Sequence, residues 1–322
     1  MGYAGYAGYV GLETRRARNN RNSFILLAIF PLILFGVLYI GCSFWGSTDL
    51  FFPLLRWVAL GVFIWYAIAY LFNDRIIDWA TGAKPLQRMG NKRVYNLVEN
   101  LCISCGMTMP KILIIEDSAL NAFASGINTG SYAVTLTRGI IENLDDKELE
   151  GVIAHELTHI RENDVRLSII ATVFVGIFAY PVKLLSGGNI FLFLRLMMTR
   201  GAWRFFIWFL FFIPVFILGF GLSKLVNLAI SRNREYAADI GAAKLTKNPK
   251  ALASALRKIS GKSVLFEGRA NLVSHLLIEH NSFETDFLKE HHPPPTPTIA
   301  RIQEMFETHP PIEHRIWILE KF

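Results

Sequence analysis

The sequence predicts an α+β integral membrane protein that is mainly helical, with four transmembrane helices and a soluble part that carries a small β-sheet. Two observations lead to this class. Hydrophobic residues make up 52% of the 322 residues, and the excess lies in long, nearly uncharged runs that are typical of membrane spans. Between these runs lie amphipathic and short apolar segments, which are typical of helices and strands in water.

The first two spans are expected at about 24–42 and 51–72, within a membrane region at 23–72. Residues 1–22 contain a Gly-Tyr repeat and a basic run, so we expect a disordered basic tail there. Basic residues precede the first span and follow the second. Both flanks are therefore expected in the cytoplasm.

Two further spans are expected at about 167–185 and 205–226, within 166–226. The apolar residues 190–198 between them are too few to cross a bilayer, so an interfacial and a re-entrant segment both stay open. Arginines in this loop weaken the orientation argument. The spans divide the soluble part into residues 73–165 and 227–322, which are expected to form one domain.

The first soluble part ends in a predicted helix with the pattern H-E-x-x-H, formed by His155, Glu156 and His159. Two histidines four residues apart share one helix face, so both imidazoles can bind one ion. The pattern is typical of zinc sites in which the glutamate accepts a proton from water. Asp145 and Glu148 resemble a capping pair for this helix. The apolar stripe expected to anchor it consists of Leu149, Ile153, Leu157 and Ile160.

Two histidines leave a catalytic zinc site one protein ligand short. Glu235 and Asp239 lie four residues apart on one predicted helix face, so one can bind the metal while the other supports a histidine. A solvated acidic pair that balances Arg232 and Arg234 is the alternative. The other candidates are His275, His280, His291, His292, His309 and His314. Spacing alone leaves the third ligand open.

Residues 111–116 and 131–137 are expected to be strands, with a small, turn-rich segment at 121–126 between them. Metallopeptidases commonly hold a substrate as an added strand at a sheet edge, and this region is a candidate for that role. The residues expected to contact the substrate are Asn121, Ala122, Phe123, Ala124, Val134 and Thr135. Ordinary sheet is the alternative interpretation.

The net charge of +7 favours contact with anionic lipid head groups. Nucleic acid is not expected as a partner, because no basic stripe is interleaved with aromatic residues. Three cysteines do not make a disulfide framework. Cys102 and Cys105 lie in an expected amphipathic helix at 91–106, where a buried structural pair is favoured over a redox or metal site.

Four segments carry a family resemblance. They are Asn-Ala-Phe-Ala at 121–124, His-Glu-Leu-Thr-His-Ile-Arg-Glu-Asn-Asp at 155–164, Ser-Arg-Asn-Arg-Glu-Tyr-Ala-Ala-Asp at 231–239 and Thr-His-Pro-Pro-Ile-Glu-His-Arg at 308–315. In this order, with two spans on each side of the second segment, they resemble the HtpX-like membrane metallopeptidases, relatives of the CaaX prenyl endopeptidases. The resemblance covers nearly the whole chain apart from the Gly-Tyr leader and about 283–299.

The resemblance implies a zincin-like metallopeptidase domain with one zinc ion per chain. By this resemblance His155, His159 and Glu235 bind the zinc, and Glu156 is the general base. No covalent intermediate is expected from a mechanism of this kind.

The resemblance also assigns supporting roles. Asp239 and Asp164 are expected to hold the ligands from behind. His309 and Arg315 match the family's tail pattern and are expected near the site, where an N–H donor or a cation can steady the oxyanion.

The expected function is that of a membrane-embedded zinc endopeptidase. It would hydrolyse peptide bonds of membrane-associated or misfolded membrane proteins at the cytoplasmic face, in protein quality control and the stress response. The expected location is the bacterial inner membrane, with several spans, and the expected partners are protein or peptide substrates and the lipid bilayer. The alternatives are a catalytically silent zinc-binding membrane scaffold and an intramembrane-cleaving metalloprotease. A transporter is less favoured, since the spans carry few charges.

Overall fold

The computed structural model describes residues 12–44, 48–169, 234–260 and 311–322. The described residues form two units. The first unit comprises residues 12–21, 73–169, 234–260 and 311–322, and the second comprises residues 22–44 and 48–72. Several expected features lie outside the described residues: the third span beyond residue 169, the fourth span, the 190–198 segment, the 283–299 insertion and His309.

Two long helices, α1 (Leu12–Phe44) and α2 (Phe51–Thr81), follow one another along the chain, with a short 3-10 turn η1 (Thr48–Leu50) before α2. They contain two stretches that are long and apolar enough to cross a membrane, Thr14–Ser43 and Thr48–Phe72. Both expected spans of this region lie inside these stretches.

The apolar side chains of these stretches are largely uncovered. In the most apolar part of Thr14–Ser43, 13% of the residues are buried, and in that of Thr48–Phe72 none is buried. Phe24, Trp57 and Phe63 are each at least 70% exposed. The core helix of a soluble protein would bury such side chains, so these surfaces favour lipid over water as their surroundings.

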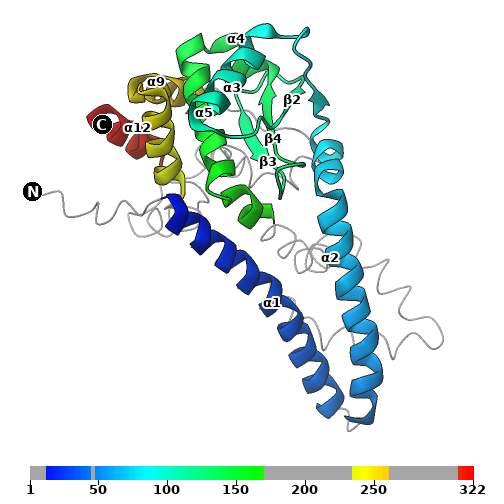
Figure 1. The fold of residues 1–322 in the computed structure, drawn as a ribbon. Helices are drawn as coiled ribbons and strands as arrows, with labels where there is room; N and C mark the ends of the chain where they lie inside the picture. Colours follow the sequence, from blue (N-terminus) through cyan, green and yellow to red (C-terminus); the bar gives the residue numbers. More distant parts are fainter. Residues whose placement is uncertain (1–11, 45–47, 170–233, 261–310) are drawn as a thin grey trace, which may run out of the picture. The chain divides into compact units, whose positions relative to one another are not determined.

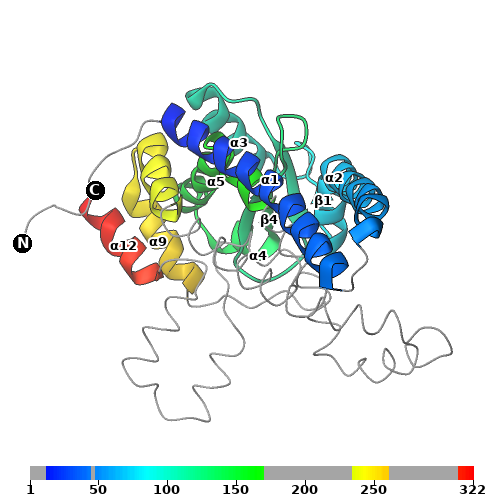
Figure 2. The same ribbon diagram turned by 90° about the horizontal axis from the view of Figure 1, so that it is seen from below.

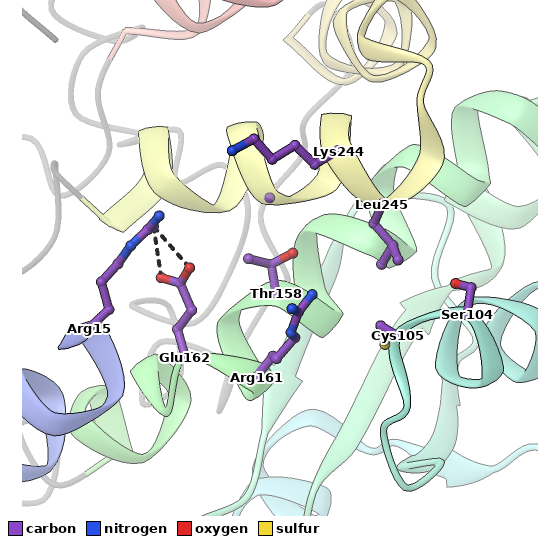
Figure 3. A pocket seen from close by; sticks show the side chains of 9 residues that line it. Arg15, Ser104, Cys105, Thr158, Arg161, Glu162, Lys244 and Leu245 are labelled. Carbon is purple, nitrogen blue, oxygen red and sulfur yellow. Dashed lines mark hydrogen bonds and ion pairs between the residues drawn. The ribbon is translucent and has the colours of Figure 1, made fainter. Parts of the chain in front are cut away.

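The start of α1 differs from the expectation of a disordered tail over residues 1–22. The chain is helical from Leu12 onward. Arg15 and Asn19 of this segment are buried, and Figure 3 shows Arg15 reaching the carboxylate of Glu162. Composition indicated disorder because the contacts that order this segment are made with residues more than 140 positions away.

A mixed four-stranded sheet lies in the first unit. Its strands are β1 (Lys84–Pro85), β2 (Lys111–Ile115), β3 (Ala122–Ser125) and β4 (Ala133–Thr137). Their order is β1-β2-β4-β3; β2 and β4 run parallel, whereas the two outer pairings are antiparallel. The two expected strands thus form β2 and β4. The segment described as turn-rich is instead an edge strand, β3, whose four residues are all buried.

The order of the strands corrects one sequence-based assignment. Val134 and Thr135 lie on β4, which pairs with β2 on one side and β3 on the other. Because the backbone of an interior strand is already paired, these two residues cannot bind a substrate as an added strand. Among the described strands near α5 (Asp146–Arg161), only β3 has one side without a strand partner.

The helix α5 occupies the centre of the first unit (Figure 1). It contacts β3, β4, α3 (Lys92–Cys105) and α9 (Pro249–Ser260). Its first turn is closed by a capping box between Asp145 and Glu148, as the sequence predicted. The apolar stripe of this helix is buried, with Leu149, Ile153, Leu157 and Ile160 each at most 3% exposed. Burial on all sides makes α5 a rigid support for the side chains that it carries.

The remaining described helices of this unit flank α5. The short helix α4 (Arg138–Asn143) follows β4, and α3 begins at an Asn91 cap and ends at Gly106, whose φ of 65° suits glycine. A further helix covers residues 234–246. Figures 1 and 2 both show α12 (Ile312–Lys321) beside α9, and the two helices are in contact. The C-terminal end of the chain is thereby brought to the α5 side of the unit.

Candidate metal centre

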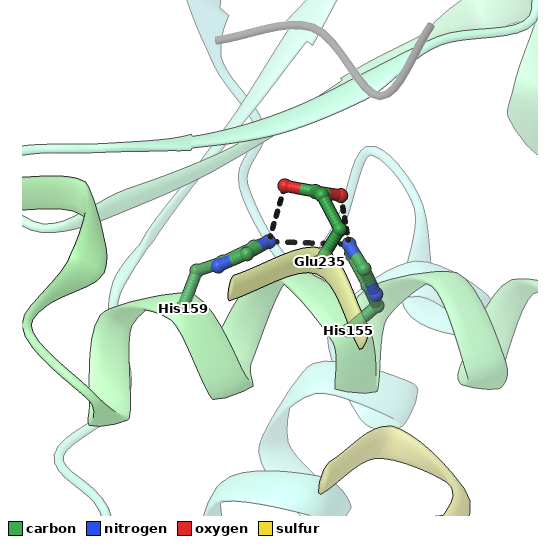
Figure 4. Close-up of side chains that lie close together, drawn as sticks. All are labelled: His155, His159 and Glu235. Carbon is green, nitrogen blue, oxygen red and sulfur yellow. Dashed lines mark hydrogen bonds and ion pairs between the residues drawn. The ribbon is translucent and has the colours of Figure 1, made fainter. Parts of the chain in front are cut away.

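Three potential metal ligands converge in the first unit. His155 and His159 point from one face of α5 toward Glu235, which lies on the helix described over residues 234–246 (Figure 4). Their ligand atoms all lie within 4.8 Å of one another, and all three side chains are buried. The structure therefore brings Glu235 to the two histidines, a choice that spacing alone left open.

The spacing of these atoms fits a tetrahedral zinc site. The two Nε2 atoms are 3.2 Å apart. Each also lies 3.5 Å from a different carboxylate oxygen of Glu235. Zinc binds such ligands at about 2.0–2.1 Å, which gives ligand–ligand distances of roughly 3.3–3.4 Å in a tetrahedron. Two imidazoles and one carboxylate are also the ligand set of many catalytic zinc sites.

Each imidazole is held from behind by a carboxylate. Nδ1 of His155 lies 3.0 Å from Oδ1 of Asp239, and Nδ1 of His159 lies 3.2 Å from Oδ2 of Asp164. If each Nδ1–H donates to its carboxylate, both Nε2 lone pairs face the space between the ligands. Asp239 and Asp164 thus lie beside the Nδ1 atoms of the two imidazoles, and their role in supporting the ligands stays a prediction.

The acidic surroundings make His155 a strong base. Burial lowers the pKa of this ring, but the hydrogen bonds with Asp239 and Glu235 outweigh it and raise the pKa to about 9. A metal ion that binds Nε2 displaces this proton, so metal binding at the site releases protons. Asp164 shows the opposite shift: burial raises its pKa, but the charge of Arg234 and the bond with His159 bring it below its ordinary value.

Arg315 reaches the same cluster from α12. Its Nε and one Nη donate to the two oxygens of Asp239 at 2.8 and 2.7 Å, and the residue is fully buried. Its other Nη lies 3.6 Å from Glu235. The family resemblance predicts that Arg315 steadies an oxyanion. In the structure Nε and one Nη of its guanidinium are bonded to Asp239, a geometry that suits holding this carboxylate behind His155, while the other Nη has no hydrogen-bond partner among the described residues.

Glu156 lies next to the ligands and is 3% exposed. Burial raises the pKa of its carboxyl above the ordinary value, while the two imidazoles and a hydrogen bond from the backbone of Ala124 oppose this shift. A carboxylate with a raised pKa is a better proton acceptor near neutral pH. The bond also links Glu156 to β3, the edge strand of the sheet.

A glycine permits the helix that carries Glu235 to approach α5 closely. A Cβ atom on Gly241 would lie 2.4 Å from Cγ2 and 2.9 Å from Oγ1 of Thr158. Any larger residue would require the Thr158 side chain or the helix that carries it to shift. No local pattern in the sequence distinguishes Gly241, because its contact partner Thr158 lies 83 positions away in the chain.

Of the other histidine candidates, His314 lies in the described part of the chain and is not a member of the cluster. His314 pairs with Tyr236 at 2.7 Å and stacks on Trp317, away from the imidazole pair. His275, His280, His291, His292 and His309 lie outside the described residues. Cys102 is buried, and burial raises the pKa of its thiol to about 12, which suits the structural role expected for it.

Two residues at the site are not predicted from the sequence. Arg234, which charge alone suggests as a surface counter-charge, has its Nε 3.2 Å from Oδ1 of Asp164. Asn19 was assigned to a disordered tail, but its amide donates to the same carboxylate oxygen at 2.6 Å. No local pattern distinguishes either residue from its neighbours.

The residues of the cluster lie within a segment that matches a known protein family. The family model described as peptidase family M48 matches residues 89–322, which include every residue of the cluster. The chain belongs to peptidase family M48. The matched range contains the H-E-x-x-H helix and Glu235.

Several M48 relatives match over nearly their full lengths. A protease HtpX homolog from Bacteroides fragilis (strain ATCC 25285) is 46% identical over 96% of this chain and 98% of the relative. Protease HtpX homologs from Tropheryma whipplei (strain Twist) and Dictyoglomus thermophilum are 36% and 34% identical, over 93% and 92% of this chain. A crystal structure of S. mikatae Ste24p has a TM-score of 0.49 and 20% identity, over 92% of this chain and 63% of that one.

Proposed function

We propose that this chain is an integral membrane zinc endopeptidase that cleaves membrane-associated or misfolded membrane proteins at the cytoplasmic face, with a role in protein quality control. The observation that carries the proposal is the buried cluster of His155, His159 and Glu235 with Glu156 beside it. Three protein ligands and an adjacent carboxylate are the parts that hydrolysis by a zinc peptidase requires. The match with protease HtpX homologs supports the same activity.

The proposed mechanism uses the described side chains as follows. A single zinc ion bound by the cluster would supply Lewis acidity toward a peptide carbonyl and lower the pKa of a water molecule toward about 7. Glu156 accepts the proton of the attacking water on its carboxylate and later delivers it to the leaving amine nitrogen. Asp239 and Asp164 keep both imidazoles turned with Nε2 toward the reacting groups.

The edge strand β3 is the proposed place for the substrate. Its four residues run along α5, and the Ala124 backbone is bonded to Glu156. A peptide added beside β3 would bring its backbone close to the general base, and backbone pairing suits varied sequences. This supports binding by Asn121, Ala122, Phe123 and Ala124. A role for His309 at the oxyanion also stays a proposal.

Membrane anchoring restricts the substrates in this proposal. α1 and α2 supply two stretches that can cross a bilayer, and we propose two more spans at about 167–185 and 205–226. The two halves of the zincin-like domain, 73–165 and 227–322, then lie on the cytoplasmic side of a bacterial inner membrane. Chains presented at that surface are the substrates that such an enzyme reaches.

The proposal is tested with protein purified in detergent micelles. Glu156→Gln should retain one zinc ion per chain by metal analysis, while the rate of casein cleavage falls by roughly 10²–10⁴-fold. Glu150→Gln makes the same chemical change six positions earlier on α5 and should leave cleavage unchanged. Full cleavage by the Glu156→Gln protein would remove the assigned base. Zinc binding without any chelator-sensitive cleavage by the unsubstituted protein would point to a silent scaffold.

A second substitution tests the third ligand. Glu235→Ala should lower the zinc affinity by more than about 100-fold, because even partners behind the ligands contribute 10–100-fold. Full zinc occupancy in this variant at limiting zinc concentration would show that another residue completes the site.

A further inference from the structure

The turn that follows α5 carries one of the supports of the metal ligands. α5 ends at Arg161, and Asn163 adopts a φ of 60°, a left-handed conformation that asparagine tolerates. After this turn Asp164 lies against His159, five positions earlier, with 3.2 Å between Oδ2 and Nδ1. The position of the Asp164 carboxylate, and with it the orientation of the His159 ring, depends on how this turn is held.

The start of α1 holds this turn through Asn19. Its side-chain amide donates to Oδ1 of Asp164 at 2.6 Å and to the carbonyl oxygen of Glu162 at 2.9 Å. Oδ2 of the same carboxylate faces His159. Asn19 is 5% exposed and Asp164 is 1% exposed, so these polar groups depend on each other for hydrogen bonds.

Neighbouring residues of α1 fix the same turn. Arg15 pairs with Glu162 at 2.9 Å (Figure 3), and both side chains are nearly buried beside a pocket of about 320 Å³. Arg16 donates to the carbonyl oxygen of Arg161. Asn20 accepts a hydrogen bond from the amide of Asn163 at 3.0 Å. Of these contacts, only that of Asn19 reaches a group that touches a metal ligand.

We propose that Asn19 is a positioning residue of the metal centre, which holds Asp164 so that His159 presents Nε2 to the zinc. The inference rests on the proposed zinc peptidase function. It assigns a task to the residues just before the apolar run expected to span the membrane at about 24–42: they complete the support of the site. The order Asn19, Asp164, His159 is a chain of hydrogen bonds in which each member fixes the next.

A pair of isosteric substitutions tests this role. Asn19 acts as a donor, so Asn19→Asp removes the donor and sets two carboxylates against each other. Asn20 acts as an acceptor, and Asn20→Asp keeps its bond with Asn163. Both variants change the charge of α1 equally. We expect zinc to leave the Asn19→Asp protein about ten times faster, as measured with a chromogenic chelator, and to leave Asn20→Asp at the unsubstituted rate.

The absorption spectrum of bound cobalt distinguishes a role of Asn19 at the metal site from a role in folding alone. Co²⁺ bound in place of zinc has visible absorption bands that report ligand geometry. These bands should shift in Asn19→Asp and stay unchanged in Asn20→Asp. Unchanged bands and an unchanged zinc release rate in Asn19→Asp would overturn the proposal. Equal changes in both variants would also overturn it, because they would show only that α1 must dock on the turn.

A double-mutant cycle tests whether Asn19 acts through Asp164. Asn19→Ala should raise the zinc release rate in the unsubstituted protein and have no further effect when Asp164→Ala is present. Additive effects would show that Asn19 does not act through this carboxylate. The cycle is independent of the function proposed above: if the unsubstituted protein binds zinc but cleaves nothing, the peptidase proposal fails and the positioning role of Asn19 is still measured.

Discussion

Arg315 is the largest fully buried side chain in the described part of the chain. A buried guanidinium is stable only when its charge and donors are matched, and Asp239 supplies both through two hydrogen bonds. Asp239 in turn faces His155. Arg315 on α12 is thus linked through Asp239 to a candidate metal ligand on α5.

Replacing Arg315 by alanine should leave Asp239 buried without its partner. We expect the free energy of unfolding to fall by about 3–5 kcal/mol, because breaking one member of a buried ion pair carries this cost. Thermal unfolding in detergent measures the change. Arg257→Ala is the matched control: its ion pair with Glu320, also on α12, is exposed, and such pairs contribute about 0–1 kcal/mol. Similar losses in both variants would contradict the role of Arg315.

Among the secondary-structure elements, the packing of the 234–246 helix on α5 sets the distance between Glu235 and the two histidines. Gly241→Ala should force the helices apart, because the new Cβ would meet Thr158 at 2.4 Å. The expected result is weaker zinc binding in a competition titration with a chelator. Adding Thr158→Ala removes the two nearest atoms and should restore most of the affinity. Tight zinc binding by the single variant would contradict this account.

The beginning of α5 offers a test that depends on pH. Hydrogen bonds from the backbone N–H groups of Glu148 and Lys147 hold the pKa of Asp145 below its ordinary value of 3.8. Because the pKa is lowered in the folded state, the cap stabilises the protein fully at pH values above 3.8. This stabilisation is lost as the pH falls through the folded-state pKa. Asp145→Ala should therefore cost about 1 kcal/mol at neutral pH and less in acid.

Thermal unfolding of the two proteins across this pH range measures the difference. Asp145→Asn retains an acceptor oxygen but does not titrate in this range, so its capping contribution should be independent of pH. If the free energy of unfolding differs between Asp145→Ala and the unsubstituted protein by the same amount at all pH values, the cap does not depend on the charge of Asp145.

The orientation in the membrane is a property of the whole molecule. With all three cysteines replaced, a single cysteine is introduced at exposed Thr48, in the link between the first two expected spans, or at Met89, which is 83% exposed. An impermeant maleimide added to intact cells should label Thr48→Cys. Met89→Cys should react only after the membrane is opened. The reverse pattern would place the metal centre on the outer side.

Much of the fold follows from local sequence patterns. The capping pair at Asp145 and Glu148, the limits of α3 between Asn91 and Gly106, and the strands β2 and β4 all match elements of the structure. Each depends on residues close together in the chain, whose capping or alternation can be read directly. The segment at β3 was not recognised, because its small residues give a weak strand pattern.

The sequence by itself determined the H-E-x-x-H helix, the alignment of His155 and His159 and the two apolar stretches in α1 and α2, because helix periodicity and span length are local properties. Only the tertiary structure decided the rest. It brought Glu235 to the imidazoles, placed Arg315 behind Asp239 and ordered Asn19 against Asp164. These contacts join residues 76 to 145 positions apart, and no local pattern specifies which distant groups pack together.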